Sequence, residues 1–446
     1  MTIGRENLFA DAGVKLKRDE KILIVEDSVA LSTLLTNRLE EETGATVIRC
    51  GSLKEARARI AEEHFILALT GLNLPDAPDG EILDLLSGSS IPTIVFTATF
   101  DAETRARCNA KKIVDYIVKH GSQTIDMVIQ TVNRILTNGA HKILVVDDAR
   151  SARSELVGIL MRQNFQVLEA SSGREALEIL AADSTIELII TDHHMADMEG
   201  YELTRRIRQT RNSEQMRIIG ISSSSDRLLS ASFLKAGASD FIYRPFVDEE
   251  LKCRIDNNIE TLTQLRHLRR LAEQDYLTGL ANRRHFFAHM RKLEKTGLHG
   301  SIALLDIDFF KTVNDTYGHD TGDIVLRAVS DVMSAMCAPA GHMPARLGGE
   351  EFAIFLSGLD AFQAHSFCEQ LRKAVEETSL AIGGQSISVT ISAGVVEFEP
   401  DDTFDNHLSA ADQLLYMAKS NGRNRVYSTL TIPEAMMSGS SSAAGN

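Results

Sequence analysis

The chain has 446 residues, of which 43% are hydrophobic, and a formal net charge of −15. This length exceeds one ordinary core and predicts roughly three domains, while the acidic excess argues against general binding to nucleic acid. There is no apolar run long enough to span a membrane, and the polar N-terminus has no signal-peptide h-region, so we expect no signal peptide. The five cysteines are too widely spaced for a zinc site or a disulfide framework. We therefore expect a cytoplasmic protein without membrane insertion.

The N-terminal half of the chain contains an internal repeat. Residues 21–28 (KILIVEDS) return as residues 142–149 (KILVVDDA), and residues 69–71 (LTG) return as residues 190–192 (ITD). Both pairs have the same offset, 121 residues, from 21 to 142 and from 71 to 192. In each copy, short β-branched runs alternate with amphipathic stretches, which predicts two doubly wound, flavodoxin-like α/β domains with parallel sheets.

The first copy has acidic and polar residues at its strand ends but differs from the second at one position. Glu26 and Asp27 follow its first strand, whereas Gly71 stands where the second copy has Asp192. Glycine offers no nucleophile, so we interpret this copy as an adaptor that pairs with its neighbouring domain or with a dimer mate. Whether Glu26 and Asp27 retain magnesium or hold no ion stays open.

The second copy places three carboxylates at the carboxyl edge of its predicted sheet. Asp147 and Asp148 follow its first strand and Asp192 its third, while Ser222 ends the fourth and Arg244 follows the fifth. Loops at this edge collect functional groups, and converging carboxylates raise one another's proton affinity unless a cation lies between them. The cluster is therefore a candidate magnesium site.

This arrangement resembles the receiver domain of bacterial response regulators. The resemblance implies that Asp192 accepts a phosphoryl group, that Asp147 and Asp148 hold one Mg²⁺, and that Ser222 senses the acyl phosphate. It also implies a cognate histidine kinase or phosphotransfer protein as a partner. The family has Lys where this chain has Arg244, and the planar guanidinium puts the coupling of phosphorylation to conformational change in question.

Two further features of this region have open alternatives. His193 and His194 follow Asp192 and could be metal ligands, but chain neighbours seldom point at one ion, which favours a surface or packing role. Apolar residues at helical spacing then follow in residues 254–274, which predicts a helical linker. Its stripe could be core packing or, as we favour, a dimeric coiled coil. The stripe consists of Ile255, Ile259, Leu262, Leu265, Leu268 and Leu271.

The last domain contains five motifs in a fixed order. They are DYLTGLANRR (275–284), DIDFFK (306–311), NDTYGHDTGD (314–323), GGEEF (348–352) and KSNGRN (419–424). Together they resemble the GGDEF family of diguanylate cyclases in its Glu-for-Asp variant, over about residues 275–428. The predicted strand, helix, hairpin, helix, strand and helix give an α+β domain whose sheet contains antiparallel strands.

The resemblance assigns roles to individual residues. Asp306, the Ile307 carbonyl and Glu351 would bind two Mg²⁺ ions, and Glu350, which alternates with Glu351 along a strand, could accept the proton of the attacking hydroxyl. Phe309 and Phe310 are expected to be both core and phosphate-loop residues. The predicted substrate-binding residues are Phe309, Phe310, Lys311, Asn314, Asp323, Gly349, Lys419 and Arg423, of which Asn314 and Asp323 pair with guanine and Lys419 and Arg423 add cations.

The function implied is condensation of two GTP molecules to cyclic di-GMP and two pyrophosphates by a homodimer, controlled by phosphorylation of the second copy. The alternative is a catalytically silent GTP-binding protein or a phosphorelay scaffold. Many family members have an RxxD motif that binds the product, but Pro339 and His342 occupy its positions here, so we expect no inhibition through that site.

The predicted organisation follows from these assignments. It comprises an N-terminal tail (1–19), a degenerate receiver domain (20–138), a receiver domain with phosphoacceptor (139–253), the helical linker (254–274), the GGDEF domain (275–428) and a disordered tail (429–446).

Overall fold

The computed structural model describes residues 20–431, apart from residues 99–103, 105–106, 109, 112, 120–122, 225, 227 and 383–384. The tail predicted for residues 1–19 and residues 432–446 of the predicted C-terminal tail lie outside the described residues. The chain divides into two compact units, Met1–Leu265 and Arg266–Asn446. Among the described helices, none combines the length and apolar character needed to cross a membrane.

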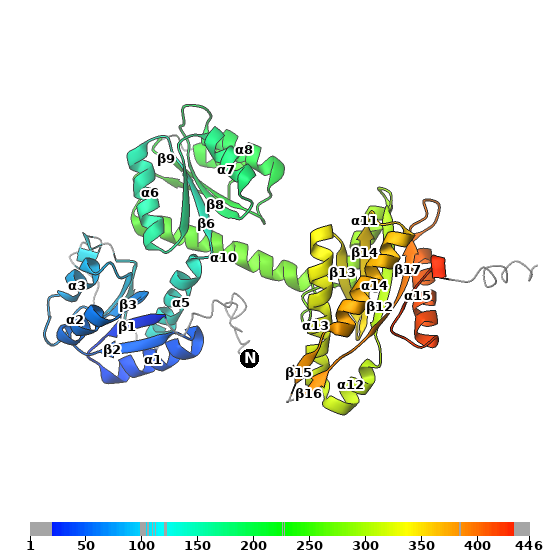
Figure 1. Ribbon diagram of the computed structural model, residues 1–446. Helices are drawn as coiled ribbons and strands as arrows, with labels where there is room; N and C mark the ends of the chain where they lie inside the picture. The colour runs from blue at the N-terminus through cyan, green and yellow to red at the C-terminus, as the bar shows by residue number, and fades with distance from the viewer. Residues whose placement is uncertain are drawn as a thin grey trace, which may run out of the picture. The chain divides into compact units, whose positions relative to one another are not determined.

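The first unit begins with a parallel α/β domain (Figure 1). Its strands are β1 (Lys21–Val25), β2 (Thr46–Cys50), β3 (Leu67–Thr70), β4 (Thr93–Thr97) and β5 (Asp115–Val118). Its helices are α1 (Val29–Thr43), α2 (Leu53–Glu62), α3 (Ile82–Gly88) and α5 (Gln123–Asn138). The strands pair in the order β2-β1-β3-β4-β5, all parallel. Helices α1 and α5 belong to one buried cluster and α2 and α3 to another, so the sheet is covered on both faces.

A second domain of the same kind follows. Its strands are β6 (Lys142–Val146), β7 (Gln166–Ala170), β8 (Ile186–Asp192), β9 (Arg217–Ser222) and β10 (Asp240–Tyr243). Its helices are α6 (Arg150–Arg162), α7 (Gly173–Ala182), α8 (Gly200–Thr210), α9 (Leu228–Ala236) and α10 (Asp248–Glu273). The sheet order is β10-β9-β8-β6-β7, with α6 and α10 against one face and α7, α8 and α9 against the other. The two doubly wound domains predicted from the repeat are confirmed.

The repeat also preserves a helix-capping device. The carboxylate of Asp76 accepts hydrogen bonds from the first two backbone N–H groups of α2, over 2.8 and 2.9 Å. Asp197, 121 positions later, accepts the corresponding pair at the start of α7, over 3.1 and 2.8 Å. These N–H groups have no partner inside their helices, so each aspartate satisfies two exposed donors and fixes its loop against the following helix.

Helix α10 combines the last helix of the second domain with the predicted linker. Ile255, Ile259 and Leu262 are buried, and the first two belong to the core cluster under the sheet. These residues therefore pack in the core. We had favoured the other alternative, a dimeric coiled coil. Leu268 and Leu271 are each 61% exposed and leave the end of the stripe open.

The second unit has a six-stranded mixed sheet. Its strands are β11 (Ala281–Asn282), β12 (Gly300–Ile307), β13 (Met343–Gly348), β14 (Glu351–Ser357), β17 (Ile391–Glu397) and β18 (Val426–Ser428), and a separate hairpin is formed by β15 (Leu380–Ile382) and β16 (Gln385–Ile387). The sheet order is β11-β13-β14-β12-β17-β18. The four central strands are antiparallel, whereas the two edge strands run parallel to their neighbours. The predicted α+β layout is confirmed.

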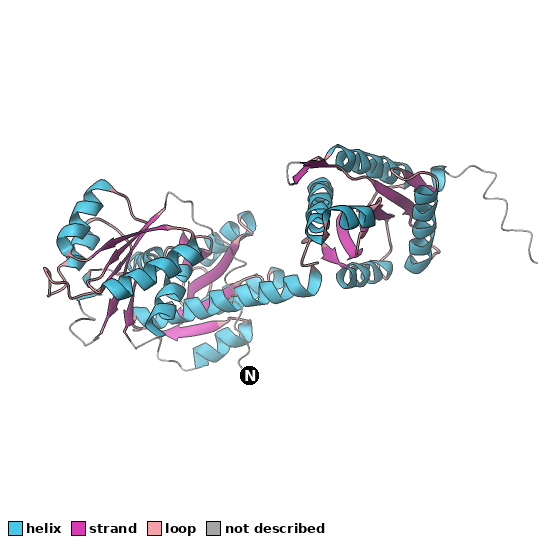
Figure 2. Cartoon of the chain, turned by 90° about the horizontal axis from the view of Figure 1, so that it is seen from below, coloured by secondary structure: helices cyan, strands magenta, loops and turns pink. Residues whose placement is uncertain are grey.

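Helices surround this sheet (Figure 2). They are α11 (Arg283–Glu294), α12 (Phe310–Tyr317), α13 (His319–Cys337), α14 (Ala361–Glu377) and α15 (Phe404–Ser420), with 3₁₀ turns at Ala338–Ala340 and Thr429–Thr431. The buried cluster on one face contains side chains of α12, α13 and α14, and that on the other contains side chains of α11 and α15. The rigid sheet therefore fixes the loops at its ends, where the site is built.

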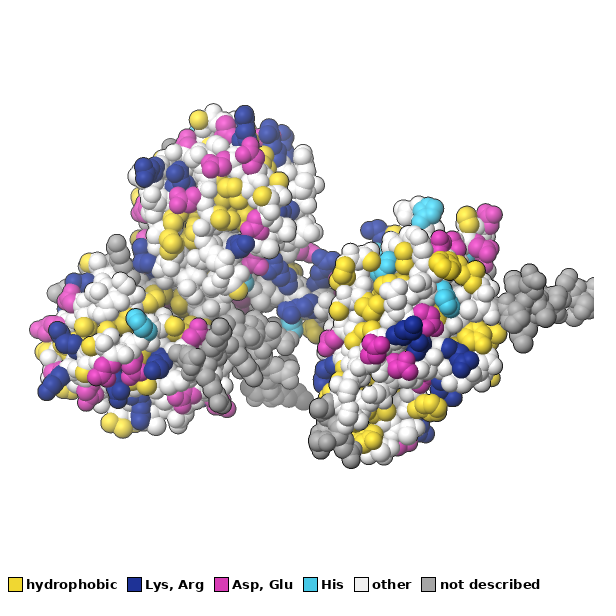
Figure 3. All heavy atoms as spheres, in the orientation of Figure 1, with side chains coloured by type: hydrophobic (Ala, Val, Ile, Leu, Met, Phe, Trp, Pro, Cys, Tyr) yellow, Lys and Arg dark blue, Asp and Glu magenta, His cyan; other side chains and the backbone are white. Residues whose placement is uncertain are grey.

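Charged side chains of both signs occur on the surface. On the face seen in Figure 3, acidic and basic side chains lie interspersed over both units. The acidic excess thus does not preclude local cationic groups that could bind an anionic nucleotide.

Candidate functional site

Two carboxylates lie opposite each other on neighbouring strands of the second unit. Asp306, near the end of β12, pairs in register with Glu351, the first residue of β14. Ile307 ends β12, and its backbone N–H donates to the Glu350 carbonyl over 3.3 Å. The structure therefore brings together the three residues for which metal binding was predicted.

The turn that precedes Glu351 has the backbone conformation expected from its glycines. Gly348 and Gly349 have φ values of 146° and 56°. Beyond their chain neighbours, no described atom lies within 4 Å of where a Cβ would stand at either residue. A residue with a side chain would be strained here, and the open space leaves room for a phosphate group to approach the backbone.

Arg346 fixes the position of this turn. Its Nε and Nη2 donate to the Gly349 carbonyl over 3.0 and 2.9 Å. Its Nη1 donates to the Asp275 carboxylate over 2.9 Å, and Asp275 in turn accepts hydrogen bonds from the backbone N–H and the hydroxyl of Thr278. The first motif of this domain thus holds the glycine turn, a role that the motif order did not predict.

The electrostatics around Asp306 suit a cation. Burial raises the pKa of the Asp306 carboxyl, the Lys419 ammonium at 2.7 Å from Oδ2 opposes this, and the charges of Glu350 and Glu351 raise it further. Lys419, on the last turn of α15, is thus the cation that faces Asp306 in this structure. Two carboxylates with a backbone carbonyl beside them are the hard oxygen donors that Mg²⁺ prefers, so the residues fit such ions.

Glu350 corrects one expectation. We expected Glu350 to alternate with Glu351 along a strand, but Glu350 lies in the turn and β14 begins at Glu351. The argument from strand alternation was therefore wrong. Glu351 nevertheless pairs with Asp306 in register, and the Glu350 carbonyl accepts the N–H of the adjacent Ile307.

The segment after β12, for which phosphate binding was predicted, leads directly into α12. Phe309 has a left-handed backbone, with φ 56° and ψ 26°, and α12 begins at Phe310. The N–H groups at this helix start are therefore available to an anion, and Lys311 lies exposed in the first turn. Phe310 is buried in the core, as expected, but Phe309 is 62% exposed, so its predicted core role was wrong. Instead, the Arg423 guanidinium lies over its ring, 4.5 Å from the centroid.

The two residues predicted to contact guanine come from adjacent helices. Asn314 lies in α12 and Asp323 in the first part of α13, with Gly318 between the helices. The Asn314 Oδ1 is buried without a hydrogen-bond partner among the described residues. A Cβ at Gly322 would stand 1.9 Å from this oxygen, so the glycine makes room for the amide. An unpartnered buried acceptor of this kind suits a ligand N–H donor.

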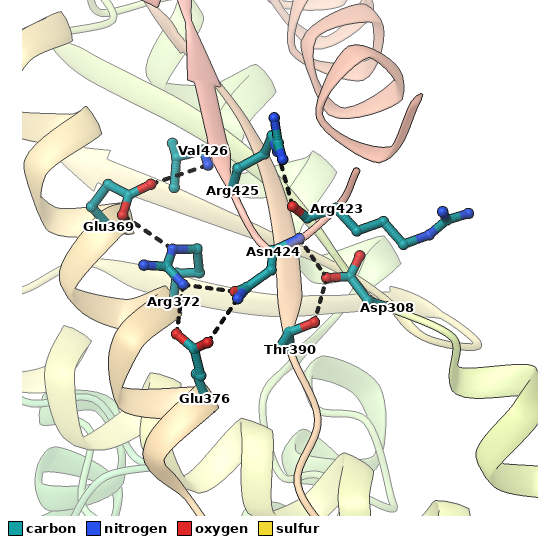
Figure 4. A network of polar contacts seen from close by, with 9 residues as sticks. All are labelled: Asp308, Glu369, Arg372, Glu376, Thr390, Arg423, Asn424, Arg425 and Val426. Carbon is teal, nitrogen blue, oxygen red and sulfur yellow. Dashed lines mark hydrogen bonds and ion pairs between the residues drawn. The ribbon is translucent and has the colours of Figure 1, made fainter. Parts of the chain in front are cut away.

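A polar network behind the phosphate loop was missed by sequence reasoning (Figure 4). The Asp308 carboxylate, 4% exposed, accepts a hydrogen bond from the Thr390 hydroxyl over 2.7 Å. The Ser392 hydroxyl also donates to it, over 2.7 Å. The carboxylate also accepts the backbone N–H of Asn424 over 2.9 Å. Asp308 therefore ties the residue before Phe309 to the segment that follows Arg423, although 116 residues separate the partners.

The Asn424 side chain extends this network to α14. Its Oδ1 accepts from Arg372 over 2.7 Å and its Nδ2 donates to Glu376 over 2.8 Å, while Arg372 and Glu376 form an ion pair over 2.8 Å. Both Arg423 and Asn424 have left-handed backbones, with φ values of 60° and 47°. Two consecutive strained residues need such support, so the network holds the backbone next to Arg423.

In the second domain of the first unit, the predicted acidic cluster is bridged by a basic residue. Arg244 donates from Nη1 to Asp192 Oδ1 over 3.1 Å and from Nη2 to Asp147 Oδ2 over 3.0 Å. Asp147 is buried at the end of β6, whereas Asp148 beside it is exposed. The guanidinium fork thus occupies the space between two of the carboxylates predicted to surround magnesium. Carboxylates that gather around a cation in this way fit Mg²⁺ as well.

The environment of Asp192 suits a reactive carboxylate. Burial raises the pKa of Asp192 and the Asp147 carboxylate raises it further, whereas the N–H of His194 and the Arg244 charge oppose this. Ser222 is 1% exposed at the end of β9, and its Oγ accepts the Ser224 N–H over 3.1 Å. Strand β9 neighbours β8, so Ser222 and Asp192 lie at the same sheet edge.

The first domain lacks this arrangement. Glu26 is 5% exposed, and both of its carboxylate oxygens accept from Lys119 Nζ over 3.1 Å. Burial raises the pKa of Glu26, and Lys119 opposes the shift. A Cβ at Gly71 would stand 2.8 Å from Glu26 Oε2. The Glu26–Lys119 pair therefore fills the space beside the position where the second domain has its acceptor.

The positions of the missing RxxD motif lie at the end of α13. Pro339 is part of the 3₁₀ turn, and His342 is 8% exposed with its ring edge-on to Phe367 at 5.1 Å. Neither side chain presents a cation or a carboxylate.

Family models match three parts of the chain. The model described as "Response regulator receiver domain" matches residues 22–130 and 143–256, which is half of the chain. The model described as "Diguanylate cyclase, GGDEF domain" matches residues 272–425. The three matches coincide with the two parallel domains and the mixed-sheet domain.

Characterised proteins are similar to parts of the chain. Response regulator PleD of Caulobacter vibrioides is 31% identical over 299 residues, which is 64% of this chain and 65% of PleD. Diguanylate cyclase A of Treponema denticola is 41% identical over 160 residues, 34% of this chain and 43% of that protein. The alignments thus cover less than two thirds of either relative. A crystal structure of a two-component system response regulator/GGDEF domain protein is 37% identical, with a TM-score of 0.49, and the match covers 55% of this chain and 99% of that one.

Proposed function

We propose that this chain, which belongs to the response regulator receiver family and carries a GGDEF domain, condenses two GTP molecules into cyclic di-GMP and two pyrophosphates. The observation that carries the proposal is the pairing of Asp306 with Glu351 beside the open glycine turn. The cationic side chains of Lys419 and Arg423 belong to the same site. Carboxylates for metal and cations for phosphate are the two requirements of phosphoryl transfer.

The residues of this chain would bind and orient the nucleotide. Asp306, Glu351 and the Ile307 carbonyl would hold two Mg²⁺ ions. When bound, such ions neutralise the charge of the triphosphate and of the transition state. The N–H groups around Phe309, Phe310 and Lys311 would contact the β- and γ-phosphates, with Lys419 and Arg423 adding positive charge. Asn314 and Asp323 would accept the N–H groups of guanine that adenine lacks.

The chemical step joins two nucleotides. The 3′-oxygen of one GTP forms a bond to the α-phosphorus of the other, the bond from that phosphorus to the β-phosphate oxygen breaks, and pyrophosphate leaves. Glu350 would accept the proton of the attacking hydroxyl. In a second step of the same kind, the 3′-oxygen of the other nucleotide attacks the remaining α-phosphorus. The second pyrophosphate leaves and the ring closes. Since one domain binds one GTP, two copies of the chain must face each other about a two-fold axis.

Control would come from the second receiver domain. In this proposal a cognate histidine kinase or phosphotransfer protein phosphorylates Asp192 in the cytoplasm, with one Mg²⁺ held by Asp147 and Asp148. Ser222 and Arg244 would respond to the new phosphoryl group, and α10 would transmit the change to the cyclase pair. The exposure of Leu268 and Leu271 supports pairing of this helix between two copies. The first receiver domain, without an acceptor at Gly71, would act as an adaptor.

The first prediction tests the activity itself. Purified chain incubated with GTP and Mg²⁺ should release cyclic di-GMP and pyrophosphate, measured by chromatography of the products. Glu351→Gln should lower kcat by about 100-fold or more, because a metal ligand is lost from the transition state. Glu377→Gln, at an exposed position in α14, is the matched control and should retain parental activity.

The outcomes separate the alternatives. GTP binding without product in the parent would favour the catalytically silent protein. Phosphotransfer without GTP binding would favour the phosphorelay scaffold. Parental turnover in Glu351→Gln would contradict the proposed site.

The second prediction tests the control. Asp192→Asn should abolish stimulation by acetyl phosphate, because the amide is not a nucleophile, while GTP affinity stays unchanged. Asp27→Asn in the first domain is the control and should still be stimulated, since that domain has no acceptor. Initial rates with and without acetyl phosphate measure both. Full stimulation of Asp192→Asn would refute the proposed phosphoacceptor.

A further inference from the structure

The loop between β8 and α8 brings three potential metal ligands together. It begins directly after Asp192 with His193 and His194 and ends with Glu199, before α8 starts at Gly200. The Gly200 N–H donates to the His193 carbonyl over 2.8 Å and closes the loop. Residues at its two ends are therefore neighbours in space.

The side chains of His193, His194 and Glu199 converge. One ligand atom of each lies within 4.8 Å of the others. The two imidazole rings have centroids 4.3 Å apart and are tilted by 50°. Sequence reasoning favoured divergent directions for these chain neighbours, but the loop turns both toward the Glu199 carboxylate.

The buried histidine has a nitrogen that packing does not explain. His193 is 4% exposed, and its ring meets Phe233 edge-on at 5.9 Å and stacks on Tyr201 at 6.1 Å. These contacts account for the position of the ring. However, Nδ1 is buried without a hydrogen-bond partner among the described residues. Leaving a buried polar atom without a partner is unfavourable, so this nitrogen suits a ligand other than the described residues.

We propose that His193, His194 and Glu199 bind a borderline divalent transition-metal ion such as Zn²⁺. Two imidazole nitrogens and one carboxylate oxygen are a common three-residue set for zinc, which leaves a fourth position for water or another ligand. Mg²⁺ prefers oxygen ligands alone, so this site differs in chemistry from the neighbouring carboxylates of Asp147 and Asp192. The site is independent of the proposed cyclase activity.

A bound ion would join the two ends of the loop through side chains as well as through the backbone. Amides of the loop would then open less often, because opening requires loss of the ion. Zinc should therefore slow hydrogen exchange in residues 193–200 of the full chain.

The affinity of the chain for Zn²⁺ tests the proposal directly. The full chain, in saturating Mg²⁺ and with the exposed Cys253 replaced by Ser in all variants, competes with a chromophoric chelator for Zn²⁺. We expect one tight site per chain. His194→Gln and Glu199→Gln, both at exposed positions, should each weaken it by about 10-fold or more, since a ligand is removed.

Two controls exclude other sites. His285 and His289 lie one turn apart on α11, with ring centroids at 6.5 Å, and could form a two-ligand site, so His285→Gln should leave the tight site intact. Asp148→Asn tests whether zinc enters the carboxylate cluster instead, and should also leave it intact. Parental affinity in His194→Gln and Glu199→Gln, loss of the site in either control, or no tight binding by the parent would overturn the proposal.

Discussion

At the residue scale, strained backbone conformations occur at the proposed nucleotide site. Phe309, Arg423 and Asn424 all have left-handed φ angles, which cost about 1 to 2 kcal/mol for each non-glycine residue. In this backbone conformation the Arg423 guanidinium lies over the Phe309 ring. Its positive charge is therefore next to the segment proposed to bind phosphate. The contacts of Asn424 with Asp308, Arg372 and Glu376 offset part of this cost.

A third prediction concerns Asn424. Asn424→Ala should raise KM for GTP about 10-fold with a smaller effect on kcat, because the strained segment relaxes and Arg423 moves. Asn424→Gly keeps the left-handed backbone without strain but removes the side-chain contacts. Its KM for GTP should therefore lie between that of the parent and that of Asn424→Ala. Steady-state kinetics on the three proteins test the order. Equal KM values in all three would show that the network does not position Arg423.

At the scale of elements, α12 and α13 carry Asn314 and Asp323, the two residues proposed to contact guanine. The helices approach closely because Gly322 in α13 has no side chain where Asn314 in α12 needs space. A glycine inside a helix costs about 1 kcal/mol relative to alanine, but alanine at this position would collide with the Asn314 amide.

A fourth prediction uses this close approach. Gly322→Ala should weaken GTP binding by about 10-fold or more, since a Cβ 1.9 Å from Asn314 Oδ1 displaces the amide. Asn314→Ala should have a similar effect. The double variant should be no worse than Asn314→Ala alone, because both changes act on one contact. Isothermal titration calorimetry gives the three affinities, and simple additivity of the two losses would contradict the coupling.

At the scale of the whole molecule, the two receiver domains differ in the side chains at the carboxyl edges of their sheets. The second has a cluster that Arg244 bridges, and the first has a Glu26–Lys119 pair beside Gly71. Contacts within the first unit join the domains. Arg134 of α5 forms ion pairs with Asp115 and with Asp256 of α10, and Lys252 donates to the Val114 carbonyl over 3.0 Å. The last helix of each domain thus takes part in one polar contact region.

A fifth prediction concerns the pH dependence of this contact. Burial raises the pKa of Asp256 from 3.8 to about 6, although Arg134 opposes the shift. Because the folded chain holds this proton more tightly than the unfolded chain, the associated stability is fully present below about pH 4 and is lost as pH rises through about 6. It amounts to about 3 kcal/mol at most. The free energy of unfolding of Asp256→Asn, taken relative to that of the parent, should therefore increase from pH 5 to pH 8.

The comparison needs a control and a measurement. Asp126→Asn changes an exposed carboxylate of α5 and should show no such trend. Denaturant unfolding at pH 5 and pH 8 gives the free energies of unfolding for each variant. A stability difference between Asp256→Asn and the parent that does not depend on pH would contradict the prediction.

The sequence by itself predicted the fold class of each domain and the residues of the candidate site. Repeats, strand and helix periods, and ordered motifs are local patterns, so they predicted two parallel domains, a mixed third domain and the facing carboxylates Asp306 and Glu351. It was wrong about Phe309 as a core residue and about Glu350 on a strand, because exposure and turn length depend on what packs nearby.

Only the tertiary structure decided how these residues are held. The bond between Asp308 and Asn424 spans 116 residues, and that between Arg346 and Asp275 spans 71. No periodicity links such partners, since their meeting depends on the sheet order that brings distant loops to one edge. The convergence of Glu199 on His193 and His194 depends likewise on how the loop closes, and chain adjacency alone suggested the opposite.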